Sequence, residues 1–228
     1  MGATGSDAAA NAVARPVLHN YFRSSTSFRV RIALALKGIA YDYDAFHLRR
    51  CEQRGERFLA LNPQGLVPAL TWTDGRVLTQ SLAILEFLDE TVPEPPLLPP
   101  DPPGRARVRE LAQMVALDLH PVNNLRVLER LRGQFGADDD AVTAWFRHWA
   151  AQTFAPLETR LSREPETGRF CHGDRVTIAD LCLVAQVANN ARFGVDPTPF
   201  PTINRIADAC LALPAFQAAH PTNQPDAE

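Results

Sequence analysis

Residues 93–104 of this 228-residue chain read PEPPLLPPDPPG, and seven of these twelve positions are proline. Proline has no backbone N–H to donate, so neither a helix nor an inner strand is expected through such a stretch. The stretch predicts a stiff, extended connection, and the character of the sequence changes across it. We therefore expect one domain over residues 17–98, a Pro-rich linker over 99–104 and a second domain over 105–228.

Before the linker, strand-like and helix-like patterns alternate. The segment FRVRIALAL (28–36) alternates as a strand would, but its Ala and Leu content, with Ser27 before it and Gly38 after it, favours a helix. Asp74-Gly75 predicts a hairpin turn between two short strands. The expected elements are strands at 16–21, 39–47, 66–72 and 76–79, and helices at 28–36, 52–61 and 81–91. This order predicts an α/β domain.

After the linker almost every pattern is helical. A long amphipathic helix is expected over 106–132, with a kink at Pro121. A second helix is expected over 138–161, because an acidic first turn suits the helix dipole. Thr177 and Asp180 form a capping-box pattern before the apolar run LCLVAQVA. With two short helices at 203–212 and 215–219, the sequence predicts an all-helical domain.

The composition excludes several classes of protein. Lys and Arg number 23 against 26 Asp and Glu, a net charge of −3, and 46% of residues are hydrophobic. These values argue against disorder and against a nucleic-acid-binding surface. No apolar stretch is long enough to span a membrane, and residues 1–16 resemble a loose, disordered tail rather than a secretory signal. The four cysteines lie far apart without metal-ligand spacing, so we expect no metal site and a reducing cytoplasm.

Two helix starts in the first domain carry polar residues. Ser24-Ser25-Thr26 places several hydroxyls where free backbone N–H groups can hold an anion such as a thiolate. Gln80-Ser81 marks a second start that suits a carboxylate. In each case plain N-capping is the alternative, although capping needs only one residue.

Other candidates are a proline in a strand and a set of arginines. Pro68 in GLVPAL predicts an edge strand, which could be a plain edge or could receive an extended peptide, and its preceding bond is a candidate cis peptide. Arginine is suited to gripping carboxylates with two hydrogen bonds, although most arginines are surface residues. The arginines beside apolar residues are Arg23, Arg29, Arg31 and Arg192. His120 and Asn124, beside Pro121, form a further polar group.

Taken together, these segments resemble the glutathione transferase superfamily, and within it the zeta class of maleylacetoacetate and maleylpyruvate isomerases. The resemblance rests on SSTSFRVRIAL (24–34), ALNP (60–63), Val67-Pro68, QSLAI (80–84), IADL (178–181) and RFGVD (192–196). It implies a thioredoxin-like domain followed by a helical bundle, bound glutathione and a homodimer. Two positions depart from the family pattern, because Thr26 replaces a cysteine and Phe28 a tryptophan. Thr26 cannot form a mixed disulfide, and threonine here is similar to the maleylpyruvate branch.

The resemblance also implies where glutathione and the substrate bind. Val67 and a cis Pro68 would pair with the cysteinyl backbone of glutathione, and Gln80 and Ser81 would hold its γ-glutamyl carboxylate. The same cleft would be lined by His47, Gln64, His120 and Asn124. Arg23 and Arg192 would meet the carboxylates of a small cis-enone dicarboxylate.

The implied reaction is a cis–trans isomerisation. A thiolate held by Ser24, Ser25 and Thr26 adds to the double bond, the resulting single bond rotates, and elimination returns glutathione. Arg23 and Arg192 would stabilise the negative charge that develops on the substrate. Two alternatives stay open: a transferase that conjugates haloacids or other electrophiles, and a non-catalytic binding protein of the same fold.

Overall fold

The computed structural model describes residues 15–228. It contains a four-stranded sheet in the order β2-β1-β3-β4, formed by β1 (Val17–Asn20), β2 (Asp42–Ala45), β3 (Ala69–Thr71) and β4 (Val77–Thr79). β1 runs parallel to β2, whereas β1–β3 and β3–β4 are antiparallel, the latter pair forming the predicted hairpin. The expected tail over residues 1–16 falls almost entirely outside the described residues.

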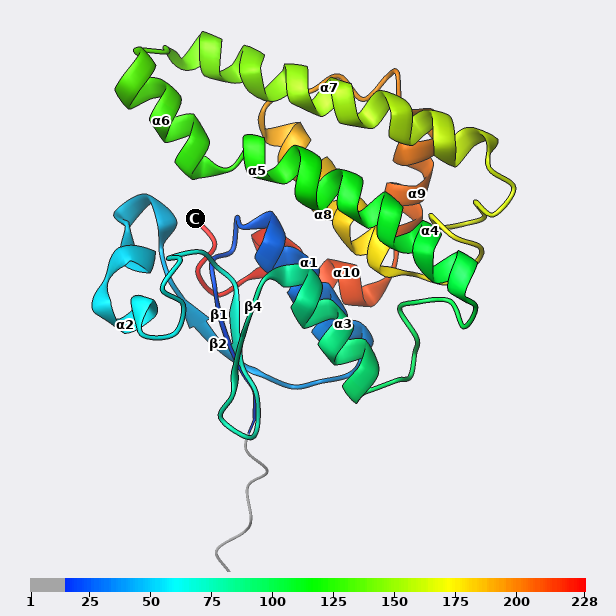
Figure 1. Ribbon diagram of the computed structural model, residues 1–228, viewed down its shortest axis with the longest axis horizontal. Helices are drawn as coiled ribbons and strands as arrows, with labels where there is room; N and C mark the ends of the chain where they lie inside the picture. Colours follow the sequence, from blue (N-terminus) through cyan, green and yellow to red (C-terminus); the bar gives the residue numbers. More distant parts are fainter. Residues whose placement is uncertain (1–14) are drawn as a thin grey trace, which may run out of the picture.

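Three helices belong to this part of the chain. α1 (Ser25–Leu36) and α3 (Ser81–Thr91) lie between the sheet and the later helices, and α2 (Glu56–Leu59) lies away from them (Figure 1). α1 begins three residues before the predicted start, because Ser24, rather than Ser27, caps it by accepting from the N–H of Ser27 at 3.2 Å.

Two predictions in this part are wrong. The helix expected over 52–61 is divided into a 3₁₀ turn, Glu52–Arg54, and the short α2, because Gly55 between them takes an extended conformation. The strand expected at an edge, β3, lies inside the sheet between β1 and β4. Pro68 is compatible with an inner strand because it precedes the first paired residue, Ala69, and its missing N–H leaves no gap in the ladder.

The remainder of the chain is mostly helical, and in Figure 1 most of it lies above the sheet, whereas its last helix lies beside α1. Its helices are α4 (Pro102–Gln113), α5 (His120–Val122), α6 (Leu125–Phe135), α7 (Asp139–Arg163), α8 (Ile178–Arg192), α9 (Pro201–Leu211) and α10 (Pro214–Ala219). A π-helical segment, Met114–Leu119, joins α4 to α5. This architecture confirms the predicted fold class, an α/β part followed by an all-helical part.

Proline explains both departures from the predicted helices. α4 begins inside the Pro-rich stretch, with Asp101 as its cap, because the first turn of a helix has N–H groups without intrahelical partners and tolerates Pro102 and Pro103. The helix expected over 106–132 widens into the π-helical segment before Pro121 and ends at Val122. α6 then begins with a new cap, Asn124.

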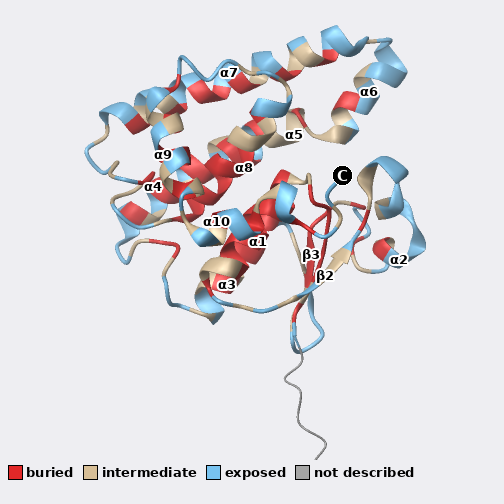
Figure 2. Ribbon diagram, turned by 180° about the vertical axis from the view of Figure 1, so that it is seen from behind, coloured by how far each residue is buried: buried red, intermediate tan, exposed pale blue. Residues whose placement is uncertain are grey.

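The core is continuous from the sheet part into the helical part. α1 packs on α8, and Figure 2 shows buried residues along both helices. At the start of α8 the predicted capping box is confirmed, since Asp180 accepts from the N–H and hydroxyl of Thr177 at 2.8 and 2.9 Å. Among the described helices, none combines the length and the apolar character that crossing a bilayer requires.

Candidate active site

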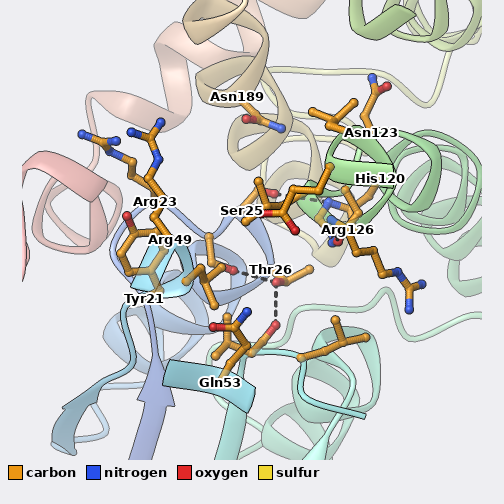
Figure 3. A pocket seen from close by; sticks show the side chains of 18 of the residues that line it. Tyr21, Arg23, Ser25, Thr26, Arg49, Gln53, His120, Asn123, Arg126 and Asn189 are labelled. Atoms are coloured by element: carbon orange, nitrogen blue, oxygen red, sulfur yellow. Dashed lines mark hydrogen bonds between the residues drawn. The ribbon is translucent and has the colours of Figure 1, made fainter. Parts of the chain in front are cut away.

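A cavity of about 390 Å³ lies between the N-terminal end of α1 and the helices α5, α6 and α8. Both parts of the chain line it. Of the predicted site residues, its lining includes Arg23, Ser24, Ser25, Thr26, Val67, His120, Asn124 and Arg192. Figure 3 shows Arg23 on one side of this cavity, His120 on the other, and Thr26 between them. The structure therefore brings together the hydroxyl cluster and both arginines predicted to meet the substrate.

The hydroxyl groups of Ser24 and Thr26 are bonded within the protein. Thr26 Oγ1 lies 3.0 Å from the carbonyl oxygen of Val67 and donates its only proton there. Ser24 Oγ lies 2.8 Å from Thr26 Oγ1, and therefore donates to it. Both protons are committed inside this cluster (Figure 3), which leaves the first backbone N–H groups of α1 as donors at the positive end of the helix.

Ser25 differs because its hydroxyl meets a histidine. Asn124 Oδ1 accepts from the N–H of Arg126 at 3.2 Å, so its amide nitrogen is the atom that faces His120 Nε2 at 3.3 Å. His120 Nε2 then accepts, its proton is on Nδ1, and Nδ1 donates to Ser25 Oγ at 3.3 Å. The proton of the Ser25 hydroxyl remains free to point into the cavity.

His120 stays neutral in this arrangement. Burial, together with the positive charges of Arg29 and Arg126, lowers the pKa of His120 to about 3. A neutral ring is what the bonds to Asn124 and Ser25 require, because a protonated ring would have no acceptor for the Asn124 amide. Above the pKa of His120, therefore, Ser25 Oγ accepts from the ring, and the Ser25 hydroxyl proton points away from His120.

The cavity is strongly cationic. Six arginines line it against one carboxylate, that of Glu129. Partial desolvation, followed by the charges of Arg23 and Arg49, lowers the pKa of Arg192. Arg23 and Arg49 both lie close enough to Tyr21 for their charges to act on its hydroxyl, and Figure 3 shows them on the same side of the cavity. Among the described residues, none of these three arginines forms an ion pair, so their charges are available to an anionic ligand.

The second predicted helix start lies beside this cavity and does not line it. Gln80 caps α3 with a positive φ of 67°, and its amide nitrogen donates to Gln64 Oε1 at 2.9 Å. Ser81, the first residue of α3, accepts from Arg29 Nη1 at 3.3 Å. The Val67–Pro68 peptide bond is cis, as the resemblance implies. Gln64 and Pro68 flank the lining residues 65–67, which places the two sites next to one another.

His47 lies outside the cavity lining. Its Nε2 is 2.8 Å from Oε1 of Glu228, in the last residue of the chain. Its role in binding a ligand stays a prediction.

Sequence reasoning missed several polar residues of the cavity, among them Arg49, Gln53 and Arg126. Arg49 and Gln53 come from the irregular turns between β2 and α2, and Arg126 from the start of α6. Gln53 Oε1 is buried without a hydrogen-bond partner among the described residues, so an incoming donor would satisfy it. No periodic pattern marks residues 48–54, and only the density of arginine there was a signal.

Within residues 15–228, no three His, Cys, Asp or Glu side chains are placed to hold a metal ion. Cys171, Cys182 and Cys210 are buried free thiols, and Cys51 is an exposed free thiol at the cavity.

A thioredoxin-like sheet, an all-helical partner and a hydroxyl-bearing helix start between them define a glutathione transferase fold. Residues 23–91 match the family described as glutathione S-transferase, N-terminal domain. A maleylpyruvate isomerase from Ralstonia sp is 51% identical over 209 residues, which cover 92% of this chain and 98% of that protein.

Two solved structures are similar over nearly their whole length. One, a maleylpyruvate isomerase described as a bacterial zeta-class glutathione S-transferase, has a TM-score of 0.91 and 50% identity, covering 93% of this chain and 100% of that one. The other, maleylacetoacetate isomerase from Methylobacterium extorquens AM1 with bound malonate and glutathione, has a TM-score of 0.91 and 47% identity, covering 93% and 99%. The chain belongs to the zeta-class glutathione S-transferase family of maleylacetoacetate and maleylpyruvate isomerases.

Proposed function

We propose that this protein is an enzyme that isomerises maleylpyruvate or maleylacetoacetate from cis to trans with glutathione as cofactor. The observation that carries the proposal is that the Ser24–Thr26 helix start and six arginines line one cavity. Arg23, Arg49 and Arg126 are labelled in Figure 3. A thiolate and a dicarboxylate are both anions, and this cavity offers helix N–H donors to one and guanidinium groups to the other. The names of the similar proteins support the same reaction.

The residues present fit glutathione. Ser81 and Gln80 lie at the positive end of α3, where a carboxylate is stabilised. Gln53, whose Oε1 accepts no hydrogen bond from the described residues, lines the same cavity as Ser25. We assign the γ-glutamyl carboxylate to Gln80 and Ser81, the cysteinyl backbone to Val67 and Pro68, and the thiol to the start of α1. His47, Gln64, His120 and Asn124 complete the predicted glutathione-binding set.

When bound, glutathione supplies a thiolate that adds to the substrate double bond and leaves again after rotation. The hydroxyl of Ser25, oriented by His120 and Asn124, donates into the space in front of α1 and favours the thiolate over the thiol. Ser24 and Thr26 hold the end of the helix in place through Val67.

Arg23 and Arg192, which line the same cavity, bind the carboxylates of the substrate. Their charges are fixed near the carbonyl oxygen on which negative charge develops, so they stabilise that charge without rearrangement. Arg49, on the same side of the cavity as Arg23, adds a third guanidinium.

The test is to assay both cis substrates with and without glutathione while titrating free thiol. Isomerisation requires glutathione and leaves its concentration unchanged. Stoichiometric loss of thiol would instead indicate a conjugating transferase, and glutathione binding without turnover of any substrate would indicate a binding protein.

We also propose that the chain forms a homodimer in a reducing cytoplasm. The family resemblance supports the dimer, and the large exposed apolar side chains Leu117 and Phe135 (57% and 69% exposed) are available to an interface. The free thiols support the reducing compartment. Light scattering at micromolar protein would give the mass of the assembly.

A further inference from the structure

Arg29 is a buried charge that the reaction described above does not use. Its side chain, on α1, is 1% exposed, and Nη1 makes one hydrogen bond, to Ser81 Oγ at 3.3 Å. Nε and Nη2 are buried and have no hydrogen-bond partner among residues 15–228, and no described carboxylate forms an ion pair with the guanidinium. An unpaired buried charge is destabilising, so a second group is expected to offset it when the protein works.

Arg31, two residues further along the same helix, shows what a structural arginine looks like. Its guanidinium is equally buried, and it donates to the carbonyls of Ala219, Tyr21 and Phe22 and to Asn20 Oδ1, all between 3.0 and 3.3 Å. All three of its nitrogens have partners. Arg29, by contrast, donates its one hydrogen bond to the hydroxyl of Ser81, at the start of another helix.

The bond to Arg29 determines the direction of the Ser81 proton. A guanidinium can only donate, so Ser81 Oγ is the acceptor, and the hydroxyl proton must be given to another group. Ser81 is the first residue of α3, where the backbone N–H groups also lack partners. A hydroxyl donor, helix N–H groups and a buried positive charge directly behind them form a site for a carboxylate.

We infer that Arg29 is a positioning residue that acts through Ser81 to bind the α-carboxylate of the γ-glutamyl residue of glutathione. The inference rests on the proposed function. Arg29 does not touch the ligand. It orients the Ser81 hydroxyl proton toward the carboxylate, and the negative charge of the carboxylate offsets the positive charge of Arg29 across that hydroxyl group. The charge that is unpaired in the free protein is thereby paired in the complex.

The test combines a change in the protein with a change in the ligand. Glutathione is compared with γ-aminobutyryl-cysteinyl-glycine, which lacks only that carboxylate, by calorimetric titration of the parent, Arg29→Met, Arg29→Lys, Ser81→Ala and the Arg29→Met/Ser81→Ala double variant. We expect the parent to prefer glutathione and Arg29→Met to reduce the preference about tenfold, the effect of one hydrogen bond to a charged group. Arg29→Lys should recover part of it, and Arg29→Met should change little in the Ser81→Ala background.

The control is Gln186→Met, which alters another buried polar side chain, on α8, with an unpartnered oxygen. It should leave the preference between the two ligands unchanged. Three results would each overturn the role of Arg29. Arg29→Met could weaken the binding of both ligands equally, or it could lower Tm without changing the preference for glutathione. The third result is that the effects of the two single variants are additive in the double variant. Failure of the parent to bind glutathione at all would instead overturn the proposed function itself.

Discussion

Replacing Arg192 with methionine tests whether the cationic wall acts on the substrate or on the fold. In the free protein the side chain is exposed at the cavity, and its one hydrogen bond, to Asn189 Oδ1, is long at 3.3 Å. Arg23 and Arg49 repel it, which is one reason why its pKa is lowered. The change should therefore leave Tm unchanged or slightly raised, because it removes repulsion and almost no bonding.

The expected effect on activity follows from the same geometry. A hydrogen bond between charged groups contributes about 1.5 to 3 kcal/mol, and water competes for an exposed guanidinium, so we take about 2 kcal/mol. This lowers kcat/KM about 30-fold. The affinity for glutathione should not change, because Arg192 is not among the residues assigned to glutathione.

The assay is steady-state isomerisation at saturating glutathione, with glutathione affinity measured by titration and Tm by calorimetry. Arg205→Met is the matched control, since Arg205 is exposed on α9 and donates to the carbonyls of Gly168 and Arg169 away from the cavity. Parental kcat/KM in Arg192→Met would refute the assigned role. If the affinity for glutathione fell by the same factor as kcat/KM, Arg192 would belong to the glutathione subsite and not to the substrate subsite.

Three further predictions address the thiolate, the histidine and the helix start. Ser25→Ala should raise the pKa of the bound thiol and lower kcat about tenfold, because the Ser25 proton is free to point into the cavity. Thr26→Val should have a smaller effect, because the Thr26 proton is donated to Val67. Thiolate absorbance against pH measures the thiol pKa in both variants. Folding lowers the pKa of His120 from 6.5 to about 3, so the free energy of unfolding should decrease as the pH falls from 6.5 toward about 3. The decrease is up to about 1.4 kcal/mol per pH unit. His120→Gln should remove this pH dependence, which denaturant titrations at several pH values would measure. Asp180→Ala should lower the free energy of unfolding by about 3 kcal/mol or more, because the N–H groups of Thr177 and Cys171 lose their buried acceptor; an unchanged denaturation midpoint would contradict this.

The sequence predicts the elements of this fold well where local chemistry decides them. Thr177 and Asp180 lie three residues apart in one turn, and Asp74-Gly75 sets a hairpin by itself, so both are visible without the rest of the chain. The errors occur where position within an element matters. Proline disfavours a helix interior, although Pro156 lies inside α7, and it suits a first turn. The sequence does not say which position Pro102 will occupy.

The site divides in the same way. Ser24, Ser25 and Thr26 are contiguous, so the helix start that they form can be recognised from the sequence. The relay that orients Ser25 cannot be, because Ser25 and His120 are 95 residues apart and the direction of the bond depends on which atom of Asn124 faces the ring. Arg49 and Gln53 lie in turns without periodicity, where nothing indicates which side chains face inward.

The position of the first predicted site residues depends on contacts with the C-terminal end of the chain. The loop after β1 carries Arg23 and Ser24, and it is held from beneath by Arg31, which donates to the carbonyls of Tyr21 and Phe22 and also to Ala219 at the end of α10. Asp226 accepts a hydrogen bond from the N–H of Phe22 at 3.1 Å and another from the hydroxyl of Tyr43. The segment after α10 therefore also holds this loop. The place of this loop is therefore tied to α10 and to the segment after it through Arg31 and Asp226. Arg31 has this structural role because each of its three nitrogens has a partner, whereas two nitrogens of Arg29, in the same helix, have none among the described residues.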